Sequence, residues 1–298
     1  MRDNIGAYIA KSGDDTQILR LIANLSTKDR DFVLLQIARM VETHKQQNPI
    51  ISNLTHSERH DLAQIWREFL PQILRLGDNL YFYGGYFLPI NHFEVSVFWH
   101  KHSLSVLEEK TLKWMRGRDF IDVGGFIGDS AVIFEREFCD KNIYTFEPTK
   151  ANFALMQRTL TLNNAKRIIP INKALGAESG AMEISILGSS SSICLSCEGG
   201  DKERIEITTL DEFVGEHKIE VGFIKVDIEG FEMEFLNGAK ETIAAQKPAM
   251  LISIYHQAGD YFGIKPLIES WDLGYRFKIH KGTDFSLVAE TVLFCEIL

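Results

Sequence analysis

The spacing of apolar positions changes twice along the chain and divides it into three regions. Over residues 1–80 apolar side chains recur every three or four residues, as on one face of a helix. Residues 81–118 are richer in aromatic residues and glycine, and from 119 to 298 short apolar runs alternate with amphipathic stretches. We therefore predict a helical N-terminal region, a connecting segment and a larger C-terminal domain.

Two helix starts are expected in the N-terminal region. Each has the capping-box pattern, in which Ser or Thr is followed three residues later by an acid: Ser26 with Asp29, and Thr55 with Glu58. Pro71 should end the second helix. The apolar faces comprise Val33, Ile37, Met40 and Val41 in the first helix, and Leu62, Ile65, Trp66, Phe69 and Leu70 in the second. We assign these faces to the core, or to an interface between two copies of the chain in a homo-oligomer.

The connecting segment predicts one strand and contains three histidines. Apolar and polar side chains alternate over Phe93–Val97, as in a half-buried strand. His92, His100 and His102 flank it and could be metal ligands, but we expect no acidic or cysteine partner at ligand spacing nearby. We expect surface or substrate-lining histidines here, and no metal site.

Seven short apolar runs in the C-terminal region have the character of strands. They are FIDV, IYTF, RIIPI, GFIKVD, AMLISIY, YRFKIH and TVLFCEIL. Amphipathic stretches follow most of the first five, which indicates a parallel sheet covered by helices. The last two are joined by a short link and must pair antiparallel. An insertion between the third and fourth strands predicts two more strands and a helix capped by Thr209 and Glu212.

A glycine turn follows the first of these strands in FIDVGGFIGDSA. Gly124, Gly125 and Gly128 allow positive φ and close approach of a ligand, and the next helix offers free N–H groups. A dinucleotide site would need GxGxxG and no acid near the pyrophosphate, but residue 123 is valine and Asp122 would repel a phosphate. A carboxylate suits the ammonium and sulfonium of S-adenosylmethionine better.

The ends of the next two strands extend this predicted cofactor site. Glu147 ends the second strand and could accept hydrogen bonds from both ribose hydroxyls. NAD enzymes share that feature, and Glu147 could also be a turn acid before Pro148. Asn172 and Ala174 follow the third strand, where the adenine would pass, although Asn172 could equally be a turn residue.

The fourth and fifth strands place candidate catalytic groups at the same edge of the sheet. Asp227 directly ends an apolar strand, which packing explains poorly, and Glu229 follows in the turn. His256 ends the fifth strand and could take a proton from an acceptor hydroxyl, or could simply bind substrate.

Together these blocks resemble the FkbM family of methyltransferases. The resemblance rests on FIDVGGFIGDSA, TFEP, NKALG, TTLDEF, FIKVDIEGFEMEFLNGA, ISIYH and ETVLFC, in that order over about residues 119–298. It implies an α/β, Rossmann-like class I methyltransferase fold: a mostly parallel seven-stranded sheet with an antiparallel last strand. It also implies S-adenosylmethionine as donor and a hydroxyl of a sugar, glycan or natural product as acceptor. Gly125 departs mildly from the alanine expected there.

The net charge and the composition argue against some classes of binding partner. The net charge of −9 gives no basic field to attract nucleic acid. No apolar run approaches the roughly 20 residues of a membrane span, and the first residues lack the apolar core of a signal peptide. Four scattered cysteines fit a reducing cytoplasm. Two alternatives stay open: an NAD-dependent oxidoreductase, and a non-catalytic interaction protein that retains the fold.

Overall fold

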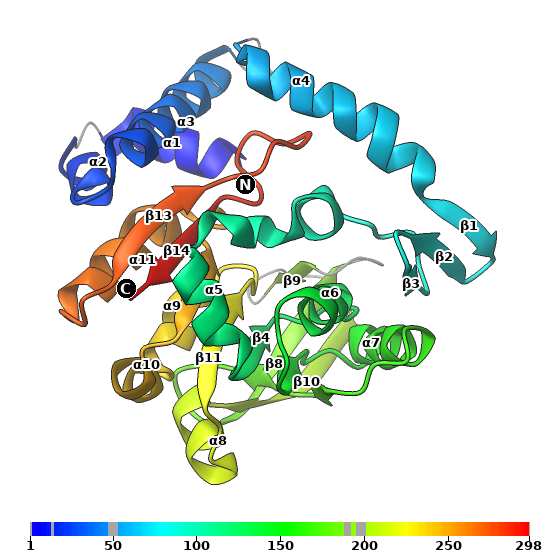
Figure 1. The fold of residues 1–298 in the computed structure, drawn as a ribbon. Helices are drawn as coiled ribbons and strands as arrows, with labels where there is room; N and C mark the ends of the chain where they lie inside the picture. Colours follow the sequence, from blue (N-terminus) through cyan, green and yellow to red (C-terminus); the bar gives the residue numbers. More distant parts are fainter. Residues whose placement is uncertain (1, 13–14, 47–52, 188–191, 195–200, 298) are drawn as a thin grey trace.

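The computed structural model describes residues 2–12, 15–46, 53–187, 192–194 and 201–297 (Figure 1). Its centre is a seven-stranded sheet in the order β13-β14-β12-β11-β4-β5-β6. Within it only β14 runs antiparallel to its neighbours, so the predicted sheet is confirmed. Its strands are β4 (Asp119–Val123), β5 (Ile143–Phe146), β6 (Ile168–Ile171), β11 (Val221–Val226), β12 (Ala249–Ser253), β13 (Arg276–His280) and β14 (Val292–Glu296).

The central strands are buried on both faces, and successive residues belong to two separate cores. Phe120 and Phe223 face one core, whereas Ile121 and Ile224 face the other. The first core is covered by α5 (Glu109–Arg116), α6 (Asp129–Glu137) and the flank of α7 (Lys150–Leu162). The second is covered by α8 (Leu210–His217), α9 (Glu232–Asn237), α10 (Lys240–Gln246) and α11 (Ala258–Ser270). This two-sided burial explains the nearly continuous apolar runs of the sequence.

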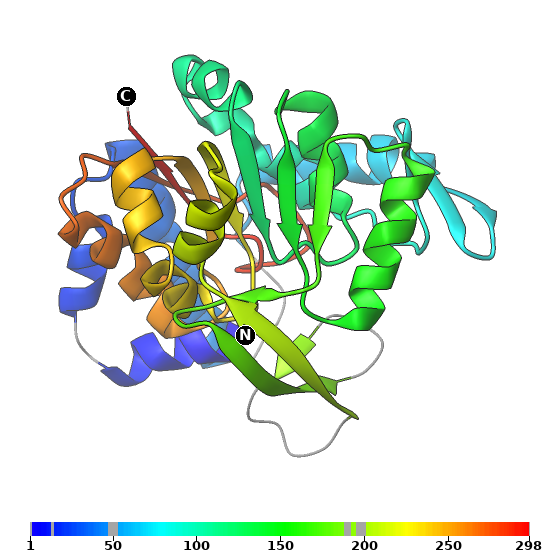
Figure 2. The same ribbon diagram turned by 90° about the horizontal axis from the view of Figure 1, so that it is seen from below.

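The insertion between β6 and β11 forms a second sheet, in the order β7-β10-β8-β9. The long β8 and β10 pair antiparallel and project beside the main sheet (Figure 2). As predicted, α8 follows with Thr209 as its cap, whose side chain accepts a hydrogen bond from the N–H of Glu212. The strands are β7 (Ala174–Leu175), β8 (Gly180–Leu187), β9 (Ser192–Cys194) and β10 (Asp201–Thr208).

The N-terminal region is helical, as predicted. It forms α1 (Arg2–Ser12), α2 (Asp15–Ile22), α3 (Thr27–Gln46) and α4 (His56–Gln64). The first three contact each other, α11 and β13, so they extend the second core (Figure 1). No helix of the described residues combines the length and apolarity needed to cross a bilayer.

The α4 helix runs across the top of the molecule in Figure 1, above the loop between β13 and β14. The capping box of Thr55 and Glu58 starts it as predicted, and a π-helical turn, Ile65–Phe69, extends it. Ile65 and Phe69 are buried, but Trp66 is 62% exposed and was wrongly assigned to the apolar face. Its ring instead meets Phe285 of the loop, with centroids 5.4 Å apart.

A three-stranded meander, β1 (Leu74–Gly77), β2 (Leu80–Tyr83) and β3 (Tyr86–Leu88), begins before the connecting segment, so the helical structure predicted as far as residue 80 ends earlier. The strand predicted over Phe93–Val97 is absent, and a π-helical turn occupies Val95–Trp99. The reason is that Val97 and Phe98 are both buried, so burial follows a helical period and not alternation.

Candidate active site

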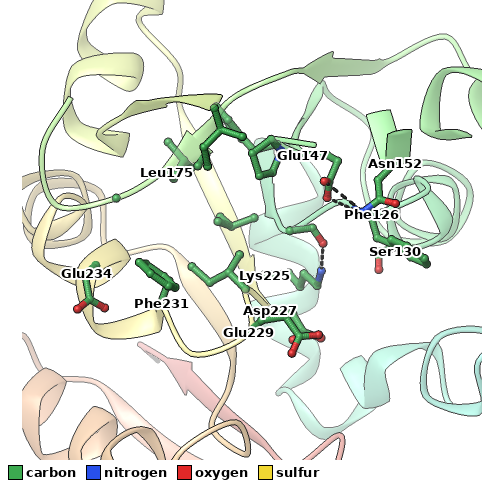
Figure 3. A pocket seen from close by; sticks show the side chains of 18 of the residues that line it. Phe126, Ser130, Glu147, Asn152, Leu175, Lys225, Asp227, Glu229, Phe231 and Glu234 are labelled. Atoms are coloured by element: carbon green, nitrogen blue, oxygen red, sulfur yellow. Dashed lines mark hydrogen bonds between the residues drawn. The ribbon is translucent and has the colours of Figure 1, made fainter. Parts of the chain in front are cut away.

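A cavity of about 410 Å³ lies at the carboxyl edge of the main sheet, where β4, β5 and β11 end (Figure 3). Loops after these strands form its floor, and the connecting segment contributes His92, Glu94 and Val97 to its wall. The second sheet faces it with six apolar side chains, those of Ala174, Leu175, Met182, Ile184, Ile205 and Ile207. A single cavity is therefore bounded by the carboxyl edge, the second sheet and the connecting segment.

The three predicted glycines have different functions in the turn. Gly124 lines the cavity with φ +81°, and a Cβ there would lie 1.9 Å from the carbonyl oxygen of Asp227. Gly125 and Gly128 do not line it. A Cβ on Gly125 would meet Thr145 Oγ1 at 2.0 Å, and Gly128 adopts φ +81° at the start of α6. All three allow close packing, but only Gly124 can contact a ligand in the cavity.

Glu147 faces the cavity and is held by several donors. Its Oε1 accepts hydrogen bonds from the N–H and hydroxyl of Thr149, at 3.0 and 2.6 Å, and from Asn152 Nδ2 at 3.3 Å. Its Oε2 accepts from the N–H of Phe126 at 3.1 Å (Figure 3). Burial raises the pKa of Glu147, and these hydrogen bonds oppose that shift. The carboxylate is thus fixed in position before any ligand arrives.

Asn172 and Ala174 are separated by the structure. Ala174 lines the cavity. Asn172 does not, because its side-chain amide donates to the carbonyl oxygens of Glu147 and Pro148, at 2.8 and 3.0 Å. Asn172 therefore shapes the turn that carries Glu147, which was the second of the two interpretations considered for it.

Asp122 lies beneath the cavity and does not line it. It is fully buried and pairs in register with Lys225 of β11. Its Oδ1 is 3.2 Å from Lys225 Nζ, and its Oδ2 accepts a hydrogen bond from Thr145 at 2.8 Å. Burial lowers the pKa of Lys225, but Asp122, Asp227 and Asp129 outweigh it and raise that pKa to about 12. The charge that was expected to attract a cationic ligand is opposed by a lysine.

Carboxyl groups dominate the other end of the cavity. Glu94, Asp129, Asp227, Glu229 and Glu290 all line it. Burial and repulsion from Asp227 and Glu94 raise the pKa of Glu290 to about 8. Burial likewise raises the pKa values of Asp227 and Glu229. Among the described residues the only Lys or Arg that lines the cavity is Lys225, which already pairs with Asp122.

His256 lies behind these acids and not among the lining residues. Its Nδ1 is 2.9 Å from Glu232, and its Nε2 is 3.3 Å from Asp227 and 3.7 Å from Glu229. Burial lowers its pKa, but the bond to Glu232 and the nearby carboxylates outweigh burial and raise the pKa to about 9. His256 therefore contacts Asp227 and Glu229 from the side away from the cavity, where it can position them.

The three histidines of the connecting segment differ in location and in hydrogen-bond partners. His100 hydrogen-bonds the carbonyl oxygen of Thr283 at 2.7 Å, outside the cavity. His92 and His102 line the cavity. Burial lowers the pKa of His102 to about 3, whereas His92 lies 3.1 Å from Glu94. His92 therefore has an acidic partner two residues away, and the expectation that none lies nearby at ligand spacing was wrong.

The C-terminal part of the chain matches a known protein domain. The model of the FkbM methyltransferase domain matches residues 122–277, more than half of the 298 residues. This chain belongs to the FkbM methyltransferase family. Members of this family take their methyl group from S-adenosylmethionine.

Individual relatives of this FkbM chain are distant. Methyltransferase 1 from Beauveria bassiana is 24% identical over 173 residues, which cover 50% of this chain and 70% of that protein. The crystal structure of methyltransferase FkbM from Methylobacillus flagellatus KT is 18% identical with a TM-score of 0.61. It matches 98% of this chain, which spans only 60% of that longer chain. The similarity extends beyond the C-terminal region to the N-terminal helices, and it establishes the class I methyltransferase fold.

Several lining residues of this FkbM domain were missed by the sequence analysis. Asp129 and Lys225 lie inside the motifs FIGDSA and FIKVD, and a lysine within a buried strand was a usable signal. Glu290 likewise begins the motif ETVLFC, whereas Glu94 lies outside every motif, 133 residues before Asp227, and only folding brings the two together.

Proposed function

We propose that this FkbM-family chain transfers a methyl group from S-adenosylmethionine to a hydroxyl group of a sugar, a glycan or another natural product. The observation that carries this proposal is the continuity of the cavity. It joins Glu147, a fixed carboxylate suited to a ribose, to a cluster of acids at Asp227 and Glu229. Residues 119–298 would form the methyltransferase domain, to which the connecting segment adds part of the wall.

The cavity has the features that S-adenosylmethionine needs. Glu147 would accept the ribose hydroxyls. Gly124 lets the turn pack directly against the backbone of Asp227 at the cavity floor, because a Cβ there would meet the Asp227 carbonyl oxygen. The ammonium and sulfonium groups carry positive charge, and the carboxylates near Asp227 suit them. In place of the direct contact first expected for Asp122, we assign it an indirect role: its pairing with Lys225, which also donates to the Gly124 carbonyl at 2.7 Å, holds the turn.

We assign the acceptor to Asp227 and Glu229. Both line the cavity, and carboxylate oxygens accept hydrogen bonds from hydroxyls. Either can orient an acceptor oxygen towards the methyl group and take its proton. Orientation of two bound reactants can supply roughly 7–11 kcal/mol, and a base roughly 10²–10⁴-fold in rate. His256 acts through these acids as a positioning residue.

Calorimetry with S-adenosylhomocysteine and with NADH tests the donor. We expect S-adenosylhomocysteine to bind and NADH not to bind. Glu147→Ala should weaken S-adenosylhomocysteine at least tenfold, because two ribose hydroxyls lose a charged acceptor worth roughly 1.5–3 kcal/mol. Glu109→Ala, whose side chain is 82% exposed on α5, is the matched control. Tight binding of NADH alone would support the oxidoreductase, and binding of neither would support a non-catalytic protein.

Transfer of a radiolabelled methyl group to a panel of sugars, glycans and other polyhydroxylated compounds tests the acceptor. With an accepted substrate, Asp227→Asn and Glu229→Gln should reduce kcat by roughly 10²-fold or more in at least one variant. His256→Ala should reduce kcat less and leave the affinity for S-adenosylhomocysteine unchanged. Full turnover by all three variants would show that the acids and His256 are assigned wrongly.

A further inference from the structure

His92, Glu94 and Asp129 come together on the wall of the cavity from two distant segments. One ligand atom of each lies within 4.8 Å of those of the other two, and His92 Nε2 is 3.1 Å from Glu94 Oε1. Bonds of about 2.0–2.2 Å to a bound cation place its ligand atoms about 3 to 4.4 Å apart. The three side chains are therefore within a small rotation of coordinating geometry.

Among the three side chains, the Asp129 carboxylate differs in its hydrogen-bond partners, because His92 and Glu94 pair with each other. It is only 4% exposed and lines the cavity. No side chain in the described part of the chain donates a hydrogen bond to its carboxylate; the N–H of Ser130 is its backbone donor. The start of α6 stabilises an acid at this position. That effect does not explain why an imidazole and a second carboxylate converge on it, whereas a cation does.

The charge around the group also favours a cation. Five acids line this end of the cavity, and Lys225 is already bonded to Asp122 and to the carbonyl oxygen of Gly124. A buried cluster of carboxylates is costly unless a positive group balances it.

A second constellation has similar spacing but is not open to a ligand. Asp227, Glu232 and His256 also have candidate ligand atoms within 4.8 Å of one another. Glu232 and His256 do not line the cavity, and they hydrogen-bond to each other at 2.9 Å. Only the His92 group presents all three of its side chains to the cavity.

We propose that His92, Glu94 and Asp129 bind a divalent cation at the acceptor end of the cavity. One imidazole and two carboxylates suit Mn²⁺, Fe²⁺ or Zn²⁺ better than Ca²⁺. The remaining coordination positions face the cavity, where an acceptor oxygen can bind and its hydroxyl pKa would fall. This use of the cation rests on the proposed methyl transfer, but binding of the cation does not.

The test is a titration of the metal-stripped full chain with Mn²⁺, followed by electron paramagnetic resonance. We expect one Mn²⁺ per chain, with affinity at least tenfold lower in His92→Ala and in Glu94→Gln. Glu234→Gln is the matched control, because Glu234 lines the opposite side of the cavity from Ser130, the neighbour of Asp129 (Figure 3). This control should bind Mn²⁺ as the unaltered chain does. Thermal unfolding checks that each variant is folded, and His92→Gln replaces His92→Ala if that variant is not.

Three results would overturn the proposal. The first is no Mn²⁺ binding at millimolar concentration, and the second is equal affinity in all variants. The third is loss of S-adenosylhomocysteine affinity in His92→Ala and Glu94→Gln without any Mn²⁺ binding, which would assign these residues to the donor's ammonium group. Since donor binding is measured separately by calorimetry, failure of the cation site and failure of the proposed methyl transfer are distinguishable.

Discussion

The two ends of the cavity differ in how their carboxylates are held. At one end, Glu147 accepts hydrogen bonds from Phe126, Thr149 and Asn152, all within 21 residues of it in sequence. At the other end, Asp129 and Glu290 lie among like charges, and they meet Asp227 from loops far apart in the chain.

At the first end, hydrogen bonds within the protein hold the carboxylate in place, whereas at the second end like charges lie close together. A carboxylate whose partners are all in the protein is ready for a ligand of fixed shape, such as a nucleoside. A group of acids that Lys225, His256 and the Tyr255 hydroxyl balance only in part favours a positive or hydrogen-donating group from outside. We therefore attribute the first end to the nucleoside of the methyl donor, and the second to the donor's positively charged groups, the acceptor and its cation.

The largest effect should come from Gly124→Ala, which disturbs both ends together. The added Cβ would lie 1.9 Å from the carbonyl oxygen of Asp227, at a backbone φ of +81°. We expect a loss of roughly 4 kcal/mol in unfolding free energy, from overpacking and backbone strain, and no measurable binding of S-adenosylhomocysteine. Urea denaturation and calorimetry measure the two. Gly117→Ala, where a Cβ meets nothing within 4 Å, should behave as the unaltered chain.

Asp122→Asn tests whether Asp122 stabilises the fold beneath the donor end or contacts the cofactor directly. Removing one partner of a buried ion pair should cost about 3 kcal/mol of unfolding free energy, because Lys225 stays charged and buried. Lys225→Met should cost a similar amount, and the double variant should cost less than the sum. If Asp122→Asn instead keeps its stability and loses only S-adenosylhomocysteine binding, Asp122 contacts the cofactor directly after all.

The pH dependence of the unfolding free energy tests whether His256 stabilises the acids at the acceptor end. The pKa of His256 is about 9 in the folded chain, against 6.5 for an ordinary histidine, because of Glu232, Asp227 and Glu229. A raised pKa means that the folded state holds its proton more tightly. The contribution is therefore complete below pH 6.5 and is lost as the pH rises through 9.

The contribution of this pKa shift to the unfolding free energy is on the order of 3 kcal/mol, from 1.36 kcal/mol per pKa unit. Urea denaturation at pH 6 and pH 9.5 should show the unaltered chain losing stability relative to His256→Asn. Parallel curves for the two proteins would mean that folding does not raise the pKa of His256, and would return it to the list of candidate bases.

The smallest effect should come from Asp61→Ala, at the contact between α4 and the loop that carries Glu290. Asp61 accepts a hydrogen bond from the hydroxyl of Thr283 at 3.0 Å. Its loss should cost about 1 kcal/mol, raise the acceptor KM modestly and leave S-adenosylhomocysteine affinity unchanged. Asp31→Ala, with a side chain 67% exposed on α3, is the control. Equal loss of donor and acceptor affinity would contradict the separation of the two ends.

The sequence predicted the parts of the molecule that depend on local pattern. Buried strands, capping boxes and the glycine turn each follow from residues close together in the chain, and all are found. Phe93–Val97 failed because an alternating pattern over five residues also fits a tight helical turn packed on one side. Trp66 failed because a helix face predicts direction but not what covers it.

The acceptor end could not be predicted, for a different reason. Neither Glu94 nor Glu290 follows a strand of the main sheet, so the rule that predicted Asp227 and His256 did not predict them, although Glu290 begins the motif ETVLFC. Asp122 was the opposite case: its motif was recognised, but the pairing of β4 with β11 sets Lys225 directly beside it. The register between β4 and β11 makes Asp122 part of an internal ion pair and not a ligand contact. Short sequence motifs do not encode this register.

The loop between β13 and β14 has a consequence for the order in which this protein is made. It reaches back over the cavity with Glu290, and its Phe285 and Thr283 touch α4, which is synthesised more than 200 residues earlier. During translation the donor end can assemble once β11 has been made, whereas the acceptor end has to wait for residue 290. A growing chain would therefore gain the capacity to bind a nucleoside before it gains a wall for the second substrate.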